Sequence, residues 1–176
     1  LLKEHSQGLI ALTACLAGEI PRLIKGGNLE KARERILEYN KLFGQDNFYL
    51  EIQDHPELPD QKMVNDQLIK FSKELKIPLV ATNDVHYFKK EDAEAQDILL
   101  CLQNKKKITD TDRMTMIGYG DYSMRSNSEM IAAFKDTPEA IHNTLKIAEK
   151  CNLEIELGNI QLPYFEVPNG YHFAIR

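Results

Sequence analysis

Three short apolar segments of the chain are separated by longer segments in which apolar residues recur with a helical period. The apolar segments cover residues 9–14, 48–53 and 79–83. In the second of them, Phe48, Leu50 and Ile52 lie two residues apart, which is the period of one face of a strand. The third begins directly after Pro78 and contains residues typical of a buried strand. We therefore predict three β-strands at these positions.

Amphipathic helices are predicted between these strands. A short helix begins near Gly18 and ends at about Lys25. The next covers residues 29–43 and ends before Gly44, a natural stop. Its apolar positions recur in steps of three and four, at Leu29, Ala32, Ile36, Tyr39 and Phe43. A third helix covers about residues 60–76. Its apolar face is formed by Val64, Leu68, Phe71 and Leu75.

The second half of the chain is predicted to be mainly helical. One helix covers about residues 90–103, with apolar positions at Ala93, Leu99, Leu100 and Leu102. Residues 104–120 are predicted to form a loop and residues 119–125 a short strand. Ser126 and Glu129 have the spacing of a capping box for a helix through Phe134. A last helix begins at residues 137–139. Its expected inner face holds Ile141, Leu145, Ala148 and Cys151.

The order of these elements predicts the α/β class with parallel strands. Strands that alternate with helices are joined as parallel neighbours by right-handed crossovers. A closed barrel of this kind usually needs more strands and roughly 200 residues or more, whereas this chain has 176 residues and three clear strands. We therefore expect part of a distorted, TIM-like β/α barrel.

Composition and charge limit the protein class and the cell compartment that can be expected for the chain. The hydrophobic fraction of 43% and the charged fraction of 28% are those of an ordinary globular protein. The net charge of −5 gives no electrostatic support for broad nucleic-acid binding by this segment alone. Three widely spaced cysteines argue against a disulfide framework and favour a reducing cytoplasm. No membrane span or signal peptide is visible, and the start without methionine indicates a piece of a longer protein.

Candidate chemistry lies at the ends of the predicted strands. Asp84 and His86 follow the third strand, and on a strand residues two apart point to the same side. Cys15 follows the first strand. The carboxyl ends of parallel strands lie at one edge of a sheet, so the three side chains are predicted to come close together. Thiolate, carboxylate and imidazole groups are ligands of zinc and other first-row divalent metals.

Simpler explanations exist for each of these residues taken alone. Asp84 and His86 by themselves are more often a strand cap, and a lone cysteine near an apolar strand is usually part of the core. Glu51 and His55, at or after the end of the second strand, are candidates for further ligands or for partners that orient a ligand.

Six segments together carry a specific combination of motifs. They are residues 5–12, Cys-Leu-Ala-Gly-Glu-Ile at 15–20, Phe-Tyr-Leu-Glu-Ile-Gln-Asp-His at 48–55, Ala-Thr-Asn-Asp-Val-His-Tyr at 81–87, residues 91–101 and Leu-Pro-Tyr-Phe at 162–165. In order and spacing they resemble the amino-terminal region of bacterial DNA polymerase III alpha subunits, over about residues 1–168. The resemblance implies the later part of a PHP (polymerase and histidinol phosphatase) domain at residues 1–157. Residues 158–176 would then be a linker toward the polymerase palm or an added tail.

The resemblance also implies a metal site. By motif, Cys15, Asp84 and His86 correspond to three of the nine metal positions of the family, where zinc or manganese is expected. The other six belong to motifs that this chain does not contain. Glu51 and His55 receive no ligand role from the resemblance. Magnesium is expected at the polymerase palm, outside this chain, and no catalytic or other cofactor-binding residue is assigned within it.

The function implied by the resemblance is DNA replication. The parent would be a DNA-directed DNA polymerase that acts on primer-template DNA and deoxynucleotides, and the isolated piece is expected to be inactive. The PHP segment would scaffold the polymerase, contact a proofreading exonuclease and other replisome subunits, and in some members carry a metal-dependent 3′-5′ exonuclease site. The truncated piece has an uncovered strand edge and apolar face, which favour self-association.

Two alternatives from other functional classes stay open at this point. One is a free-standing PHP-type phosphoesterase, in which clustered metals activate water. The other is a metal-free structural module that binds a proofreading exonuclease. The polymerase is favoured over both alternatives. The Asp-Val-His pair at 84–86 is a general feature, whereas the residues at 48–53 and 92–97 resemble the polymerase subunits specifically.

Overall fold

The structure is a computed structural model that describes residues 1–160 and residue 162. Its centre is a parallel sheet of three strands in the order β1-β2-β3, where β1 is Ala11–Leu12, β2 is Phe48–Gln53 and β3 is Leu79–Thr82. In the register, Ala11 pairs with Phe48 and Leu50 pairs with Leu79. The predicted parallel arrangement of the three strands is confirmed, and the protein is a mixed α/β structure.

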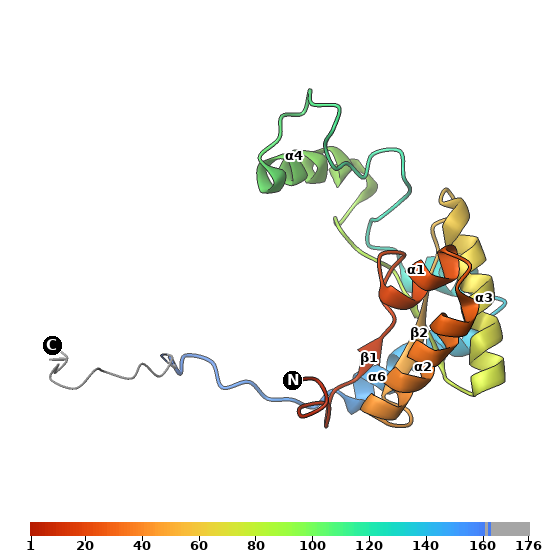
Figure 1. Cartoon of the computed structure of the whole chain (residues 1–176). Coiled ribbons are helices and arrows are strands. Elements are labelled where there is room, and N and C mark those ends of the chain that lie inside the picture. Colours follow the sequence, from red (N-terminus) through yellow and green to blue (C-terminus); the bar gives the residue numbers. More distant parts are fainter. Residues whose placement is uncertain (161, 163–176) are drawn as a thin grey trace, which may run out of the picture.

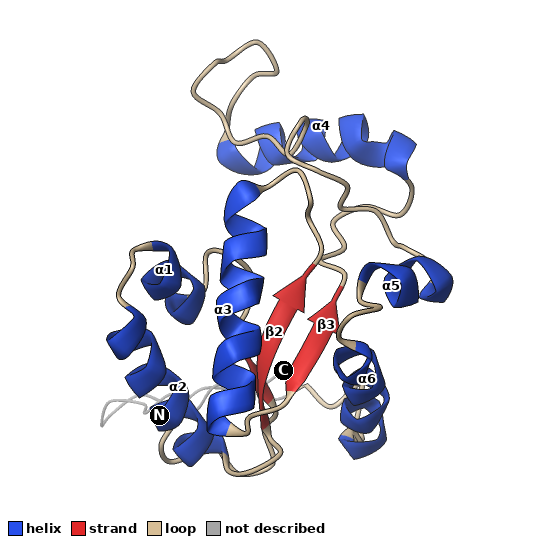
Figure 2. Ribbon diagram, turned by 90° about the vertical axis from the view of Figure 1, so that its right-hand side faces the viewer, coloured by secondary structure: helices blue, strands red, loops and turns tan. Residues whose placement is uncertain are grey.

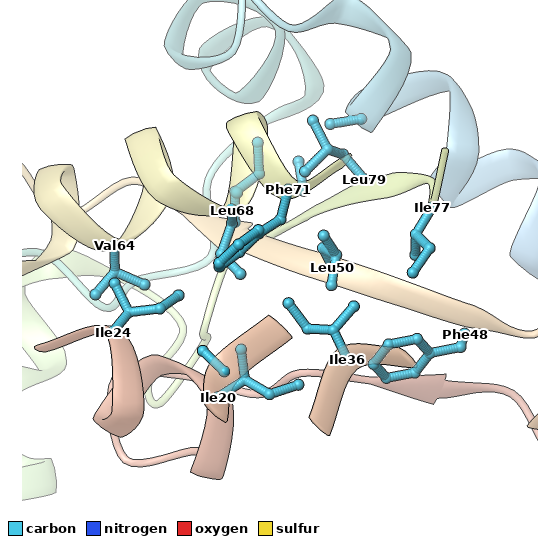
Figure 3. Packing of buried hydrophobic residues seen from close by; sticks show 14 of the residues in the cluster. Ile20, Ile24, Ile36, Phe48, Leu50, Val64, Leu68, Phe71, Ile77 and Leu79 are labelled. Atoms are coloured by element: carbon cyan, nitrogen blue, oxygen red, sulfur yellow. The ribbon is translucent and has the colours of Figure 1, made fainter. Parts of the chain in front are cut away.

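Helices pack on the sheet and contribute most of the side chains in the hydrophobic core. The first three are α1 (Glu19–Lys25), α2 (Leu29–Phe43) and α3 (Pro59–Leu75). In Figure 2, α3 runs alongside β2, while α6 (Pro138–Lys150) lies beside β3. Between these layers the apolar side chains of the predicted helix faces meet those of the strands. The labelled members of this core in Figure 3 are Ile20, Ile24, Ile36, Phe48, Leu50, Val64, Leu68, Phe71, Ile77 and Leu79.

The remaining helices follow β3. A single 3-10 turn, η1 (Lys90–Asp92), leads into α4 (Ala93–Asn104). Helix α4 lies beyond the end of the sheet toward which the strands point (Figures 1 and 2). The short helix α5 (Asn127–Ala133) has the predicted capping box. The backbone N–H of Glu129 donates to Ser126 Oγ at 3.3 Å, and Ser126 N–H donates to Glu129 Oε2 at 2.8 Å.

The first strand is shorter than predicted. It ends at Leu12, because Ala14 adopts a left-handed backbone conformation with φ of 63°. The hydroxyl of Thr13 then takes the place of a backbone partner and accepts a hydrogen bond from Glu51 N at 2.8 Å. The predicted strand at residues 119–125 is also wrong, since only Ser123 forms an isolated parallel bridge, with Tyr87.

The inner face of α6 agrees only in part with the predicted one, because Ile141 packs against the core but the other three positions do not. Leu145, Ala148 and Cys151 are exposed, whereas Ala140 and Asn143 are buried against β3. Asn143 Nδ2 donates a buried hydrogen bond of 2.7 Å to the carbonyl oxygen of Leu79. Because β3 is an edge strand in this sheet, its outer backbone groups have no neighbouring strand to pair with. The Asn143 amide faces the sheet and pairs with one of these groups.

Helix α4 buries only some of its apolar positions. Leu99 and Leu102 are mostly exposed, while Leu100 and Cys101 are buried. The carboxylate of Asp97, in the same helix, is buried and accepts hydrogen bonds of 2.6 Å from both Arg113 and Thr115. This buried contact holds the loop that follows α4, and so fixes which side of the helix is covered.

Candidate metal centre

Asp84 and His86 meet in a turn after β3. The strand ends at Thr82, and Asp84 has a left-handed backbone with φ of 55°, so strand periodicity does not place these residues. Instead the turn folds His86 back, and its Nδ1 lies 2.8 Å from the carbonyl oxygen of Asp84. A carbonyl only accepts, so this contact requires the proton on Nδ1. It leaves the lone pair of Nε2 available for a metal.

The carboxylate of Asp84 lies between two imidazoles. Its Oδ2 is 3.6 Å from His55 Nε2, and its Oδ1 is 3.9 Å from His86 Nδ1. The His55 imidazole beside it lowers the pKa of Asp84, and the charges of His86 and His55 act in the same direction, against burial, which raises the pKa. Asp84 is therefore an anion at neutral pH, as a metal ligand must be.

Tyr122 joins the two histidines from a distant part of the chain. Its ring centroid lies 4.5 Å from that of His55 and 5.3 Å from that of His86. His86 N–H donates to the carbonyl oxygen of Tyr122 at 2.9 Å, and Tyr122 N–H donates to Tyr87 Oη at 3.1 Å. Burial, followed by the charges of Asp84, Tyr87, Cys15 and Glu57, raises the pKa of the Tyr122 hydroxyl.

Sequence reasoning missed Tyr122 as a site residue. It follows a loop without a regular period, and no local motif distinguishes it from Tyr119, which lies three residues earlier. Its place in the site depends on long-range contacts with the turns that follow β2 and β3. A single sequence carries no signal for such contacts.

Cys15 lies in the turn that ends β1. Its side chain is half-buried, and its carbonyl oxygen accepts a hydrogen bond of 2.8 Å from Gly18 N. Gly18 is required here, because a Cβ at this position would lie 2.3 Å from the carbonyl oxygen of Thr13. Among the described residues, no hydrogen bond or ion pair connects Cys15 with Asp84 or His86. The structure thus brings Asp84 and His86 together, and the position of Cys15 beside them stays a prediction.

Glu51 links the ends of all three strands. Its Oε2 accepts the backbone N–H of Ala14 at 2.9 Å. Its Oε1 accepts Thr82 Oγ1 at 2.5 Å and Gln53 Nε2 at 3.1 Å. Because both carboxylate oxygens are already occupied by donors, Glu51 acts as a support for the turns that carry Cys15 and Asp84.

The donor set fits a divalent metal in kind but is incomplete in number. Carboxylate, imidazole and thiolate are suitable donors, and the buried His55 nitrogens beside Asp84 have no hydrogen-bond partner in the part of the chain that the structure describes. Within residues 1–160 and 162, however, no three His, Cys, Asp or Glu side chains are close enough to hold a metal. The assignment of Cys15, Asp84 and His86 as ligands stays a prediction.

Comparison with known proteins identifies relatives along nearly the whole chain. Residues 1–55 match the PHP domain family. The chain is 44% identical over 168 residues to the DNA polymerase III subunit alpha of Borreliella burgdorferi, which covers 95% of this chain. It is 41% identical over 171 residues to that of Treponema pallidum and 38% identical over 176 residues to that of Thermus aquaticus. In each case the chain spans about 14% of the relative's length.

These relatives agree with the resemblance drawn from the motifs. Among the described residues, no helix is long and apolar enough to cross a membrane. Residues 163–165 of the motif set, and most of the predicted linker at 158–176, lie outside the described residues. The resemblance is confirmed: residues 1–55 are similar to PHP domains, and nearly the whole chain is similar to one segment of bacterial DNA polymerase III alpha subunits.

Proposed function

We propose that this chain is a segment of the catalytic alpha subunit of a bacterial replicative DNA polymerase III. The observation that carries the proposal is 44% identity to an alpha subunit over 95% of the chain, which continues far beyond the PHP match at residues 1–55. The parent would be a DNA-directed DNA polymerase that adds deoxynucleotides to a primer on template DNA. Magnesium at the palm, elsewhere in the parent, would assist this phosphoryl transfer.

The role proposed for this segment is that of a PHP scaffold. Residues 1–157 would complete part of a distorted β/α barrel, and residues 158–176 would lead toward the palm. The parallel sheet and its helical cover are compatible with a portion of such a barrel. The proofreading exonuclease and other replisome subunits are the proposed protein partners, and the bacterial cytoplasm is the proposed location.

Cys15, Asp84 and His86 are the proposed ligands of zinc or manganese in the parent, together with residues outside this chain. When bound, such a metal would supply activated water for hydrolysis of a DNA 3′ end. The geometry here supports three preparatory roles. The Asp84 carbonyl fixes the His86 tautomer, the left-handed turn directs the Asp84 carboxylate toward both histidines, and Glu51 anchors the Cys15 turn.

The two other hypotheses differ in what they require of the parent. A free-standing phosphoesterase needs a complete metal cluster and no palm. A metal-free module needs neither. The polymerase is favoured because similarity to alpha subunits extends through α3, β3 and α4, well past the PHP match.

The first test of the proposal is primer extension. We expect the full-length protein that contains this chain to extend a primed template with deoxynucleotides and Mg²⁺. The present chain alone should add no nucleotide above a mock preparation, because the magnesium-binding palm is proposed to lie elsewhere. Extension by the isolated chain, or none by the full-length protein, would contradict the proposal.

The second test concerns the metal. We expect Asp84→Ala to lower the zinc or manganese content of the full-length protein by at least tenfold, because the substitution removes a proposed ligand. The present chain should hold less than one metal per molecule with or without the substitution. Elemental analysis of dialysed samples measures both. Asp66→Ala, an exposed position on α3, is the matched control and should leave the content unchanged. Stoichiometric metal in the isolated chain that is insensitive to Asp84→Ala would place the site elsewhere.

A further inference from the structure

His55 is a buried histidine whose polar atoms have no partner. It follows β2 by two residues, and only 3% of its surface is exposed. Neither Nδ1 nor Nε2 has a hydrogen-bond partner among the described residues. Buried polar groups are nearly always paired, so an imidazole in this condition needs an explanation. Packing alone would be served better by an apolar side chain of the same size.

The two ring nitrogens of His55 face different neighbours, and only one of them faces a carboxylate. Nδ1 faces the backbone of Gly120, where an added Cβ would lie 3.7 Å away. One face of the ring lies against Tyr122 at 4.5 Å, with 32° between the ring planes. Nε2 points toward Asp84 and lies 3.6 Å from Oδ2, just outside hydrogen-bond distance. Charged groups near the ring include Asp84 on the Nε2 side and Glu57, whose Oε2 lies beside Gly120.

We infer that His55 is a positioning residue for Asp84, with Nε2–H directed at Oδ2 so that Oδ1 is kept free to bind a cation. This rests on the proposed metal site. Ligating carboxylates are commonly held by a hydrogen bond to the oxygen that the metal does not use. Oδ1 lies 3.9 Å from Nδ1 of His86, the second proposed ligand.

To position Asp84, the His55 ring must itself be held in place, and Tyr122 holds it. Tyr122 packs against both imidazoles and is itself held by backbone contacts to His86 and Tyr87. Nε2 and Oδ2 are 3.6 Å apart, so a displacement of a few tenths of an ångström brings them within hydrogen-bond distance. Because the left-handed backbone at Asp84 limits where its carboxylate can point, His55 and that backbone together define its direction.

The test uses three variants of the full-length protein that contains this chain. His55→Phe keeps an aromatic ring against Tyr122 but has no N–H. His55→Gln places an amide N–H near the position of Nε2. His142→Phe, at an exposed histidine on α6, is the matched control. The affinity for Mn²⁺ and Zn²⁺ is measured by titration of the metal-free protein, and stoichiometry is measured at saturation.

We expect His55→Phe to weaken affinity for Mn²⁺ and Zn²⁺ by roughly 10–100-fold while stoichiometry at saturation is unchanged. His55→Gln should restore most of the affinity, and His142→Phe should not alter it. A purely structural role predicts wild-type affinity for His55→Phe and no rescue by glutamine, so that result overturns the inference. Loss of one metal equivalent in His55→Phe would also overturn it, because His55 would then be a direct ligand.

The proposed function and this inference fail in different ways. If Asp84→Ala abolishes metal binding but His55→Phe does not weaken it, only the inference is wrong. If Asp84→Ala binds metal like the unaltered protein, the proposed site is wrong and the inference falls with it. Circular dichroism and thermal unfolding of each variant show whether the fold is retained, and His55→Gln provides the second variant if His55→Phe does not fold.

Discussion

Leu68→Ala is expected to lower the free energy of unfolding by about 2–5 kcal/mol. Leu68 lies in the middle of α3 with none of its surface exposed, in the core between the helices and the sheet (Figure 3). Its removal leaves a cavity that α3, which is packed against α1 and β2, cannot close. Urea unfolding followed by circular dichroism measures the loss, because the midpoint shifts while the slope stays constant.

Leu145→Ala is the matched control for this experiment. The same leucine-to-alanine change is made on α6, at a side chain that is 65% exposed. We expect a change of less than about 0.5 kcal/mol. A loss at Leu145 as large as that at Leu68 would show that α6 packs on the face predicted from its apolar pattern, and would contradict the buried Asn143 contact.

The helices were predictable where local pattern and packing agree. The steps of three and four from Leu29 to Phe43 predicted α2 at its observed bounds, because the same apolar stripe packs against α1 and β2. Gly44, with φ of 87°, ends it as expected. The strands at residues 48–53 and 79–82 were equally predictable, because both are apolar segments that the sheet buries.

The prediction failed where a polar contact decided the packing. In α6 a single hydrogen bond from Asn143 to the edge strand outweighs the apolar positions at Leu145 and Ala148. In α4 the buried Asp97, paired with Arg113, determines the covered face. Periodicity counts apolar residues and gives no weight to a polar side chain that has a distant partner, so it missed the burial of Asn143 and Asp97.

The proximity of Asp84 and His86 was predictable from the sequence, but its geometry was not. Asp84 and His86 do lie together, yet a left-handed turn rather than a strand brings them there. His55 was a candidate because it follows β2, whereas its burial beside Asp84 depends on Tyr122, which lies 67 positions later in the sequence. Such a contact is a property of the closed fold, and no segment of the sequence carries it locally.

Glu51→Ala is expected to lower the free energy of unfolding by about 2–3 kcal/mol, because hydrogen bonds to a charged group are among the stronger ones and their donors would be left without an acceptor. The carboxylate receives Ala14 N–H on one oxygen and Thr82 and Gln53 on the other. Glu51→Gln should cost less, because its one carbonyl oxygen still serves one of these two sets.

The effect of Glu51→Ala should be concentrated at the turn that carries Cys15. Loss of the acceptor frees the Ala14 amide, so its hydrogen exchange should become faster than that of amides in α2. Glu34→Ala, at an exposed glutamate of α2, should change stability by less than about 0.5 kcal/mol and leave the Ala14 amide unaffected. Unchanged stability together with unchanged Ala14 exchange in Glu51→Ala would mean that the strand ends are held without Glu51. The neighbourhood of Cys15 and Asp84 would then have to be explained by the sheet alone.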